Sequence, residues 1–155
     1  MSGKLNGLHI LVTRPEHQAQ PLCQLLEEQG ATTLRFPLIV IEPLNSPVLP
    51  ELSRYDIIIF VSNNAVTLGI PLIEPLLNSA KIATVGKGTA RLLDEKGFPA
   101  DILPTGQFDS EGLLAHPHLQ NIKNQSVLIV RGEGGRPLLG DELQQRGARV
   151  EYLAA

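Results

Sequence analysis

Four short segments of the sequence combine basic side chains with glycine or small polar residues, a combination typical of anion-binding loops. Free backbone N–H groups at a helix start attract anions, and the positive end of the helix dipole adds to this attraction. Arginine can in addition hold a carboxylate through two parallel hydrogen bonds. The four segments are Thr13-Arg14-Pro15, Ser62-Asn63-Asn64-Ala65, Gly86-Lys87-Gly88-Thr89 and Arg131-Gly132-Glu133-Gly134-Gly135-Arg136. They predict a site for a negatively charged ligand.

Each segment also has a plainer structural explanation. Ser62 or Asn63 could simply cap the helix that follows. The glycines after Arg131 could serve only a tight turn, and Arg14 could form an ordinary surface ion pair. The occurrence of four such segments at equivalent strand ends favours the binding interpretation.

A dinucleotide-binding loop is the strongest rival interpretation. Residues 132–137 match the first two glycines of the Gly-x-Gly-x-x-Gly pattern, but Pro137 replaces the third. Glu151 lies 19 residues after Gly132, near the place where a ribose-binding acid would fall. The missing glycine makes this alternative the weaker one, and it stays open at this point.

Other chemistries have little support in the sequence. The only cysteine, Cys23, is surrounded by leucines and is expected to be a buried thiol. There is no Gly-x-Ser-x-Gly segment and no P-loop spacing. The histidines show no metal-ligand spacing with cysteine or glutamate, so no metal site is expected: His9, His17, His116 and His118.

The composition is that of a globular protein. Hydrophobic residues make up 43% of the 155 residues and charged residues 19%, with a formal net charge of −3. A net negative charge argues against a nucleic-acid partner, whose phosphates require a basic surface. The longest apolar run, residues 37–41, is too short to span a bilayer, and residues 1–7 lack an apolar signal region. No membrane partner is expected, and the cytoplasm is the default compartment.

Alternating strands and helices must position the four segments. Short Val/Ile/Leu-rich runs without polar alternation predict parallel strands covered on both faces, at residues 8–13, 56–61, 81–85 and 126–130. We expect an α/β fold with a five-stranded parallel sheet in the larger part, including a short edge strand near Ile102. Asp109 or Ser110 should cap a helix, and Pro71 and Pro75 should break or kink the helix that begins near Ser62.

An internal repeat indicates a duplicated architecture. Arg14 and Gly30 recur as Arg131 and Gly147, each pair 117 positions apart, within the same strand–Arg–helix–Gly–Ala pattern. Two opening units imply two similar domains, but only one set of middle strands is present. We therefore expect the second domain to be incomplete in this chain.

Taken together, the segments resemble the uroporphyrinogen-III synthase family. Order and spacing agree over nearly the whole chain, and specificity comes from the set of short motifs. The matching pieces are residues 11–15, 36–39, 60–66, 85–90, 110–114, 128–136 and 146–148. The resemblance implies flavodoxin-like domains, each a parallel sheet flanked by helices. Residues 1–37 would be the opening βαβ unit of a domain built from both chain ends, and residues 38–155 the middle domain, with a linker near 38–50.

The resemblance also implies a reaction. The family closes hydroxymethylbilane, a small-molecule substrate, into uroporphyrinogen III with ring D inverted and water lost, without metal or cofactor. Hand-over of this substrate from hydroxymethylbilane synthase is a partner interaction to test. The full-length protein would be a monomer, whereas a chain cut after the middle domain would be inactive and would expose apolar surface for self-association.

Site residues are carried over by position in the same way. The substrate-binding residues would be Arg14, Ser62, Asn63, Gly86, Lys87, Thr89, Arg131 and Gly132. The catalytic residue is not assigned, because the tyrosine that the family usually carries would fall at position 156, after Ala155. Tyr152 lies within the predicted strand and is not taken as its equivalent.

Overall fold

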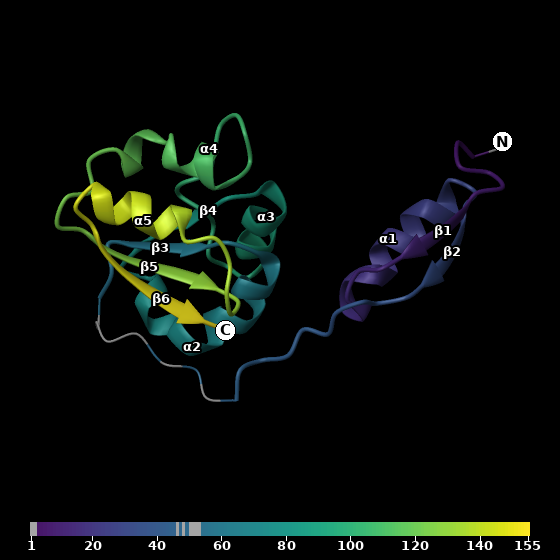
Figure 1. The fold of residues 1–155 in the computed structure, drawn as a ribbon, viewed down its shortest axis with the longest axis horizontal. Coiled ribbons are helices and arrows are strands. Elements are labelled where there is room, and N and C mark those ends of the chain that lie inside the picture. The colour runs from purple at the N-terminus through teal and green to yellow at the C-terminus, as the bar shows by residue number, and fades with distance from the viewer. Residues whose placement is uncertain (1–2, 46, 48, 50–53) are drawn as a thin grey trace. The chain divides into compact units, whose positions relative to one another are not determined.

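The computed structural model describes residues 3–45, 47, 49 and 54–155. The chain divides into two compact units, Met1–Glu42 and Pro43–Ala155, and each is described here by itself (Figure 1). The predicted linker near residues 38–50 lies partly outside the described residues. The assignment of the segments to an end-built and a middle domain stays a prediction.

The first unit is a single βαβ motif. Strand β1 (His9–Val12) leads through helix α1 (Glu16–Glu28) to strand β2 (Thr32–Arg35), which pairs with β1 in parallel. One face of this two-stranded sheet packs on α1 through a small core that contains Cys23, which is 1% exposed. The predicted buried thiol is therefore confirmed.

The second unit is built on a parallel sheet of four strands in the order β4-β3-β5-β6. Three of these strands match the predicted runs at residues 56–61, 81–85 and 126–130, because continuous apolar segments can be covered on both faces. The fourth, β6, lies at the edge of the sheet. Their bounds are β3 (Ile57–Phe60), β4 (Lys81–Thr84), β5 (Ser126–Arg131) and β6 (Arg149–Ala154). All four residues of β3 are buried, as expected for a central strand.

The predicted fifth strand is wrong in extent. Only an isolated bridge joins Ile102 to Ala83 of β4. Pro99 and Pro104 flank this short segment, and neither can donate a backbone N–H to continue a ladder. Ile102 is nevertheless 0% exposed, so the residue contributes to the core although it does not extend a strand.

Helices cover both faces of the sheet (Figure 1). On one face, helices α2 (Asn63–Leu77) and α3 (Lys87–Glu95) pack on alternate strand residues such as Phe60 and Val130. On the other face, helices α4 (Ser110–Leu114) and α5 (Leu138–Gln145) and the 3₁₀ helix η1 (Pro117–Leu119) pack on Ile59 and Ile129. This is the three-layer α/β arrangement that the sequence predicts.

Two helix predictions have different outcomes. The Asp109 side chain caps α4 by accepting a hydrogen bond of 2.8 Å from the Gly112 N–H. Of the break or kink predicted at Pro71 and Pro75, the break is wrong, because α2 continues through both residues to Leu77. The kink stays a prediction. None of the helices in the described part of the chain has the length and apolar content that a bilayer crossing requires.

Candidate functional site

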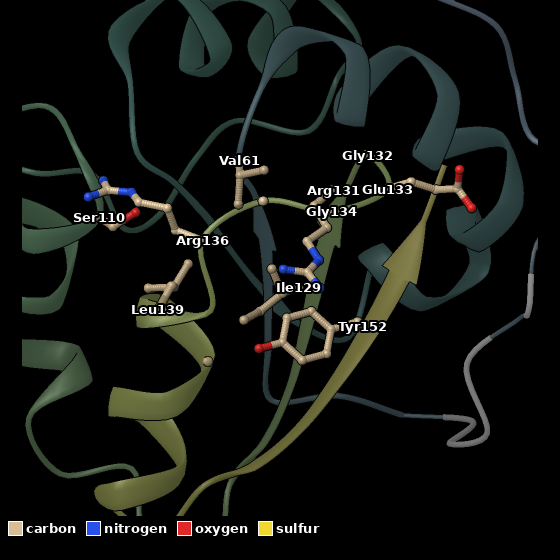
Figure 2. Close-up of a pocket in the computed structure, with 12 residues that line it drawn as sticks. Val61, Ser110, Ile129, Arg131, Gly132, Glu133, Gly134, Arg136, Leu139 and Tyr152 are labelled. Carbon is tan, nitrogen blue, oxygen red and sulfur yellow. The ribbon is translucent and has the colours of Figure 1, made fainter.

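A pocket lies at the carboxyl ends of β3, β5 and β6, on the face covered by α4 and α5. From β3 the chain continues to β4 on one side, whereas β5 pairs with β3 on the other. The order in which strands are added to the sheet therefore reverses between β3 and β5. At such a point a crevice opens beyond the strand ends, where α/β proteins commonly bind ligands. The pocket has a volume of ≈ 250 Å³ and is lined by Val61, Ser110, Ile129, Arg131, Gly132, Glu133, Gly134, Gly135, Arg136, Leu139, Gly140 and Tyr152 (Figure 2).

The loop after β5 forms one wall of the pocket. Gly134 and Gly135 have φ values of 75° and 101°, which other residues adopt only with strain. The turn explanation therefore holds for these two glycines. Gly132 does not have a positive φ, and a Cβ there would meet no atom within 4 Å. Gly132 thus leaves open space beside the pocket, as a ligand-binding position requires.

Arg131, the last residue of β5, points into the pocket over an aromatic ring. Its Cζ lies 4.2 Å from the centroid of the Tyr152 ring, and Figure 2 shows the guanidinium directly beside that ring. Tyr152 belongs to β6 and faces the same side of the sheet as Ile129 and Arg131, because it pairs in register with Ile129. The sequence interpretation placed Tyr152 in the strand but missed its place in the site. Alternation along β6 was the available signal.

The second arginine of the loop is engaged differently. Arg136 Nη1 lies 3.3 Å from Glu111 Oε1, and this ion pair joins the loop to α4. In Figure 2 the Arg136 side chain extends toward Ser110, away from Tyr152. Both partners are largely exposed, so the pair contributes little to stability, but it lies at the edge of the pocket.

Ser62, Asn63 and Thr89 lie where α2 and α3 begin. Ser62 Oγ accepts a hydrogen bond of 3.1 Å from the Ala65 N–H, so the capping explanation holds for this residue. Thr89 Oγ1 donates to Asn63 Oδ1 at 3.0 Å and links the two helix starts. Thr89 is only 7% exposed, whereas Asn63 is exposed. Of this pair, Asn63 is the residue that can reach a ligand.

Gly86 and Lys87 also lie at the start of α3. Gly86 is the N-cap residue, in an extended conformation without side-chain capping. Lys87 Nζ lies 4.5 Å from the centroid of the Phe108 ring, which holds the ammonium group near the helix start. These residues follow β4, at the same end of the sheet as the pocket, although neither lines it.

Arg14 is exposed and follows β1 in the first unit. It is therefore described with that unit alone, and its predicted role stays a prediction. The second unit brings together Arg131 and Gly132 in the pocket, and Asn63 and Thr89 at the neighbouring helix starts. Of the predicted binding residues, Arg131 and Gly132 line the pocket, and Tyr152 and Gly140 are among the lining residues that the sequence did not indicate.

The structure argues against the dinucleotide interpretation, because Glu151 lies on the sheet face opposite the glycine loop. Glu151 pairs in register with Leu128, whose side chain lies in the core on the α2 face. Glu151 Oε2 accepts a hydrogen bond of 2.6 Å from the Tyr55 hydroxyl on that face. The glycine loop and its pocket lie on the opposite face, with Ile129 and Tyr152. A ribose bound at the loop would not meet this carboxylate.

The histidines nearest in sequence form a stacked pair. The rings of His116 and His118 lie 5.2 Å apart, and burial, followed by the charge of His118, lowers the pKa of His116 from its ordinary value of 6.5. Within the residues that the structure describes, no three histidine, cysteine or acidic side chains gather as metal ligands.

Known proteins match this chain along most of its length. The family model for uroporphyrinogen-III synthase HemD matches residues 20–155. The uroporphyrinogen-III synthase of Chlorobaculum parvum is 35% identical over 133 residues, covering 79% of this chain and 52% of the relative. That of Escherichia coli is 33% identical over 158 residues, covering 94% and 63%. The chain thus spans between half and two thirds of the length of these relatives.

Solved structures agree on the fold. A mutant uroporphyrinogen III synthase from Thermus thermophilus matches with a TM-score of 0.61 and 21% identity, covering 96% of this chain and 61% of the other. The Helicobacter pylori synthetase matches with a TM-score of 0.54 and 17% identity, covering 95% and 60%. Since the family model covers most of the chain, this protein belongs to the uroporphyrinogen-III synthase family.

Proposed function

We propose that the protein acts as a uroporphyrinogen-III synthase, a cyclising hydro-lyase of tetrapyrrole biosynthesis. Its substrate would be hydroxymethylbilane, which bears acetate and propionate on each pyrrole. The observation that carries this proposal is the pocket at the strand ends, with the Arg131 guanidinium in it, in a chain of this family. An arginine beside small residues suits the binding of a carboxylate on a larger ligand.

The proposed reaction needs accurate positioning more than strong acid–base chemistry. The hydroxymethyl oxygen leaves as water and gives an azafulvene cation. Ring D then attacks the carbon that carried the hydroxyl group and forms a spiro intermediate. This intermediate fragments and closes again with ring D inverted. Closure without inversion occurs unaided, so the enzyme must select one geometry. Arg131, Gly132 and Asn63 would hold substrate carboxylates, with Arg14, Ser62, Gly86, Lys87 and Thr89 as the further predicted binding residues.

The activity is proposed for the protein at the length of its relatives. The chain spans 52% of the Chlorobaculum parvum relative and 63% of the Escherichia coli one. In the predicted architecture the substrate lies in a cleft between two domains. The pocket of the second unit would supply only one domain's side of that cleft. We accordingly expect the 155 residues alone to bind substrate weakly and not to direct ring inversion.

An isomer assay tests the proposal. Hydroxymethylbilane is supplied to the 155-residue chain and to the same chain extended by the part of the Escherichia coli relative outside the match. Products are oxidised and the type I and type III isomers separated by chromatography. The extended chain should produce the type III isomer, Arg131→Gln in that chain should lower its yield, and the short chain should leave only unaided type I closure. A folded extended chain that gives type I alone would contradict the proposal.

An anion-binding module without catalysis is the second candidate. The donor-rich loop after β5 would support it, because this loop could bind phosphate without a second domain. Calorimetric titration with NADH and ATP tests this alternative. Micromolar affinity for either nucleotide, together with no effect on isomer ratio in the extended chain, would favour the module over the enzyme.

We also propose that the 155-residue chain self-associates through its first unit. Leu11 and Leu34 are paired in register and are 55% and 65% exposed, on the sheet face that α1 leaves uncovered. Sedimentation velocity should show a concentration-dependent species that Leu34→Glu suppresses. A monomer at all concentrations would refute this point.

Hand-over from hydroxymethylbilane synthase would be tested separately, by adding that enzyme in place of free substrate.

A further inference from the structure

We propose that Tyr152 is a positioning residue that holds Arg131 for carboxylate binding, and that Gly140 provides the space that Tyr152 needs. The inference rests on the proposed function, because it concerns how the pocket would hold one substrate carboxylate. Tyr152 does not act on the reacting atoms. It acts through the guanidinium of Arg131, at 4.2 Å from its ring centroid.

The first step concerns which hydrogen-bond donors of Arg131 stay available beside the Tyr152 ring. Arg131 Cζ lies over the Tyr152 ring. The guanidinium carries five N–H donors that point outward in one plane, and an aromatic ring accepts none of them as a carboxylate would. The plane therefore stays available for a bidentate carboxylate. Arg136 differs, since its Nη1 is already 3.3 Å from Glu111. Among the described residues, no carboxylate forms such an ion pair with Arg131.

The second step concerns the place of the ring. The Tyr152 hydroxyl lies so close to Gly140 of α5 that a Cβ at position 140 would overlap it. Gly140 does not have a positive φ, so backbone conformation does not explain a glycine here. Glycine in a helix costs stability relative to alanine. The close approach of Tyr152 is the feature that requires it, and Figure 2 shows the Tyr152 hydroxyl pointing toward α5 while the Arg131 guanidinium lies beside the ring.

The third step is the effect on binding. An unrestrained arginine loses much rotamer freedom when it grips a ligand, and this loss weakens affinity. A guanidinium already held over a ring has lost part of that freedom. From the usual strength of an exposed cation–π contact, removal of the ring should weaken carboxylate binding by about two- to fivefold.

Two readouts on the 155-residue chain test the inference. The first is the ¹H–¹⁵N resonance of Arg131 Nε, assigned by its loss in Arg131→Lys. The ring should displace this resonance upfield. The second is the dissociation constant for uroporphyrin, a fluorescent tetrapyrrole with eight carboxylates. Tyr152→Phe should preserve both values. Tyr152→Leu should abolish the ring shift and weaken binding by about two- to fivefold.

Gly140→Ala separates positioning from simple loss of the aromatic side chain. It retains Tyr152 but displaces the ring, so it should reproduce both effects of Tyr152→Leu. Gly106→Ala is the matched control, because a Cβ at Gly106 would meet no atom within 4 Å. Urea unfolding checks that each variant is folded. Tyr152 is 37% exposed, so its ring can move outward when Gly140→Ala adds a methyl group. This variant therefore gives a folded test even where Tyr152→Leu is unstable.

The outcomes distinguish the inference from the function on which it rests. Unchanged resonance and affinity in both Tyr152→Leu and Gly140→Ala, with native uroporphyrin binding intact, would overturn the inference and leave the function standing. Equal losses in Tyr152→Phe and Tyr152→Leu would also overturn it, because the hydroxyl would then be the active feature. If the extended chain of the isomer assay keeps the ring shift but binds no uroporphyrin, the proposed function would be overturned, and only the contact between Arg131 and Tyr152 would be supported.

Discussion

The Tyr55 hydroxyl donates a hydrogen bond of 2.6 Å to Glu151 Oε2 and joins two segments that are 96 positions apart in the sequence. Tyr55 lies just before the central strand β3 and is 0% exposed, whereas Glu151 belongs to the edge strand β6. The contact therefore ties the edge strand to the core on the α2 face. A buried hydroxyl bound to a carboxylate is a comparatively strong interaction.

Tyr55→Phe should lower the free energy of unfolding by about 1.5–3 kcal/mol, the usual loss for a hydrogen bond to a charged group. Urea denaturation followed by circular dichroism measures this loss. Tyr152→Phe is the matched control, because that residue is 37% exposed, and its change should stay within about 0.5 kcal/mol. Equal effects of the two substitutions would show that the Tyr55–Glu151 contact does not stabilise the sheet.

Gly69→Ala should destabilise the second unit by about 1–3 kcal/mol, because overpacking strains a rigid core. A Cβ on Gly69 of α2 would overlap Val130 Cγ1, and Val130 is 0% exposed in β5. Val130→Ala combined with Gly69→Ala should cost less than the sum of the single changes, since the second change removes the overlapping atom.

Gly88→Ala is the control for this glycine. In α3 its Cβ would meet no atom within 4 Å, so the substitution should leave stability unchanged or raise it by up to about 1 kcal/mol. Thermal unfolding of all four variants provides the comparison. Strict additivity of Gly69→Ala and Val130→Ala would argue that helix packing on β5 adapts freely.

Thr89→Val should reduce stability by about 0.5–1.5 kcal/mol, the net value of a typical hydrogen bond. The substitution keeps the shape of the buried side chain but removes the hydroxyl that donates to Asn63 Oδ1. Thr89→Ser keeps this donor and should lose less. Urea midpoints of the two variants decide the point, with exposed Thr67→Val on α2 as the reference. A larger loss in Thr89→Ser would mean that methyl packing, not the hydrogen bond, dominates.

Acidification below pH 6.5 should destabilise the protein in part through His116. Its folded pKa lies below the ordinary value of 6.5, so the unfolded chain binds the proton more readily. The stabilising contribution is complete above pH 6.5 and is lost as the pH falls from there through the folded pKa. Unfolding measured at intervals from pH 8 to pH 5 should show a smaller loss in His116→Asn, which keeps a side-chain acceptor at the start of η1. Parallel curves for both proteins would contradict the assignment.

Local signals in the sequence are sufficient for most of the strands and helices and for the strand ends at which the candidate site lies. The run Ile57–Phe60 predicts a strand covered on both faces, and the structure buries every residue of it. The leucines around Cys23 predict a buried thiol, which the first unit confirms. The glycine-rich segment after β5 predicts a ligand-binding loop, and the structure places Arg131 and Gly132 in a pocket there. These features depend on residue type and spacing within one segment, which the sequence contains.

Only the tertiary structure decides which residues from different segments meet. The register between β5 and β6 puts Tyr152 beside Arg131 and sends Glu151 to the opposite face, although the two are adjacent in sequence. Packing of α2 on the sheet lets the helix continue through Pro71, where the local rule predicts a break. Register and packing arise from contacts over long sequence separations, and a one-residue change of register would reverse the side chains that each face presents.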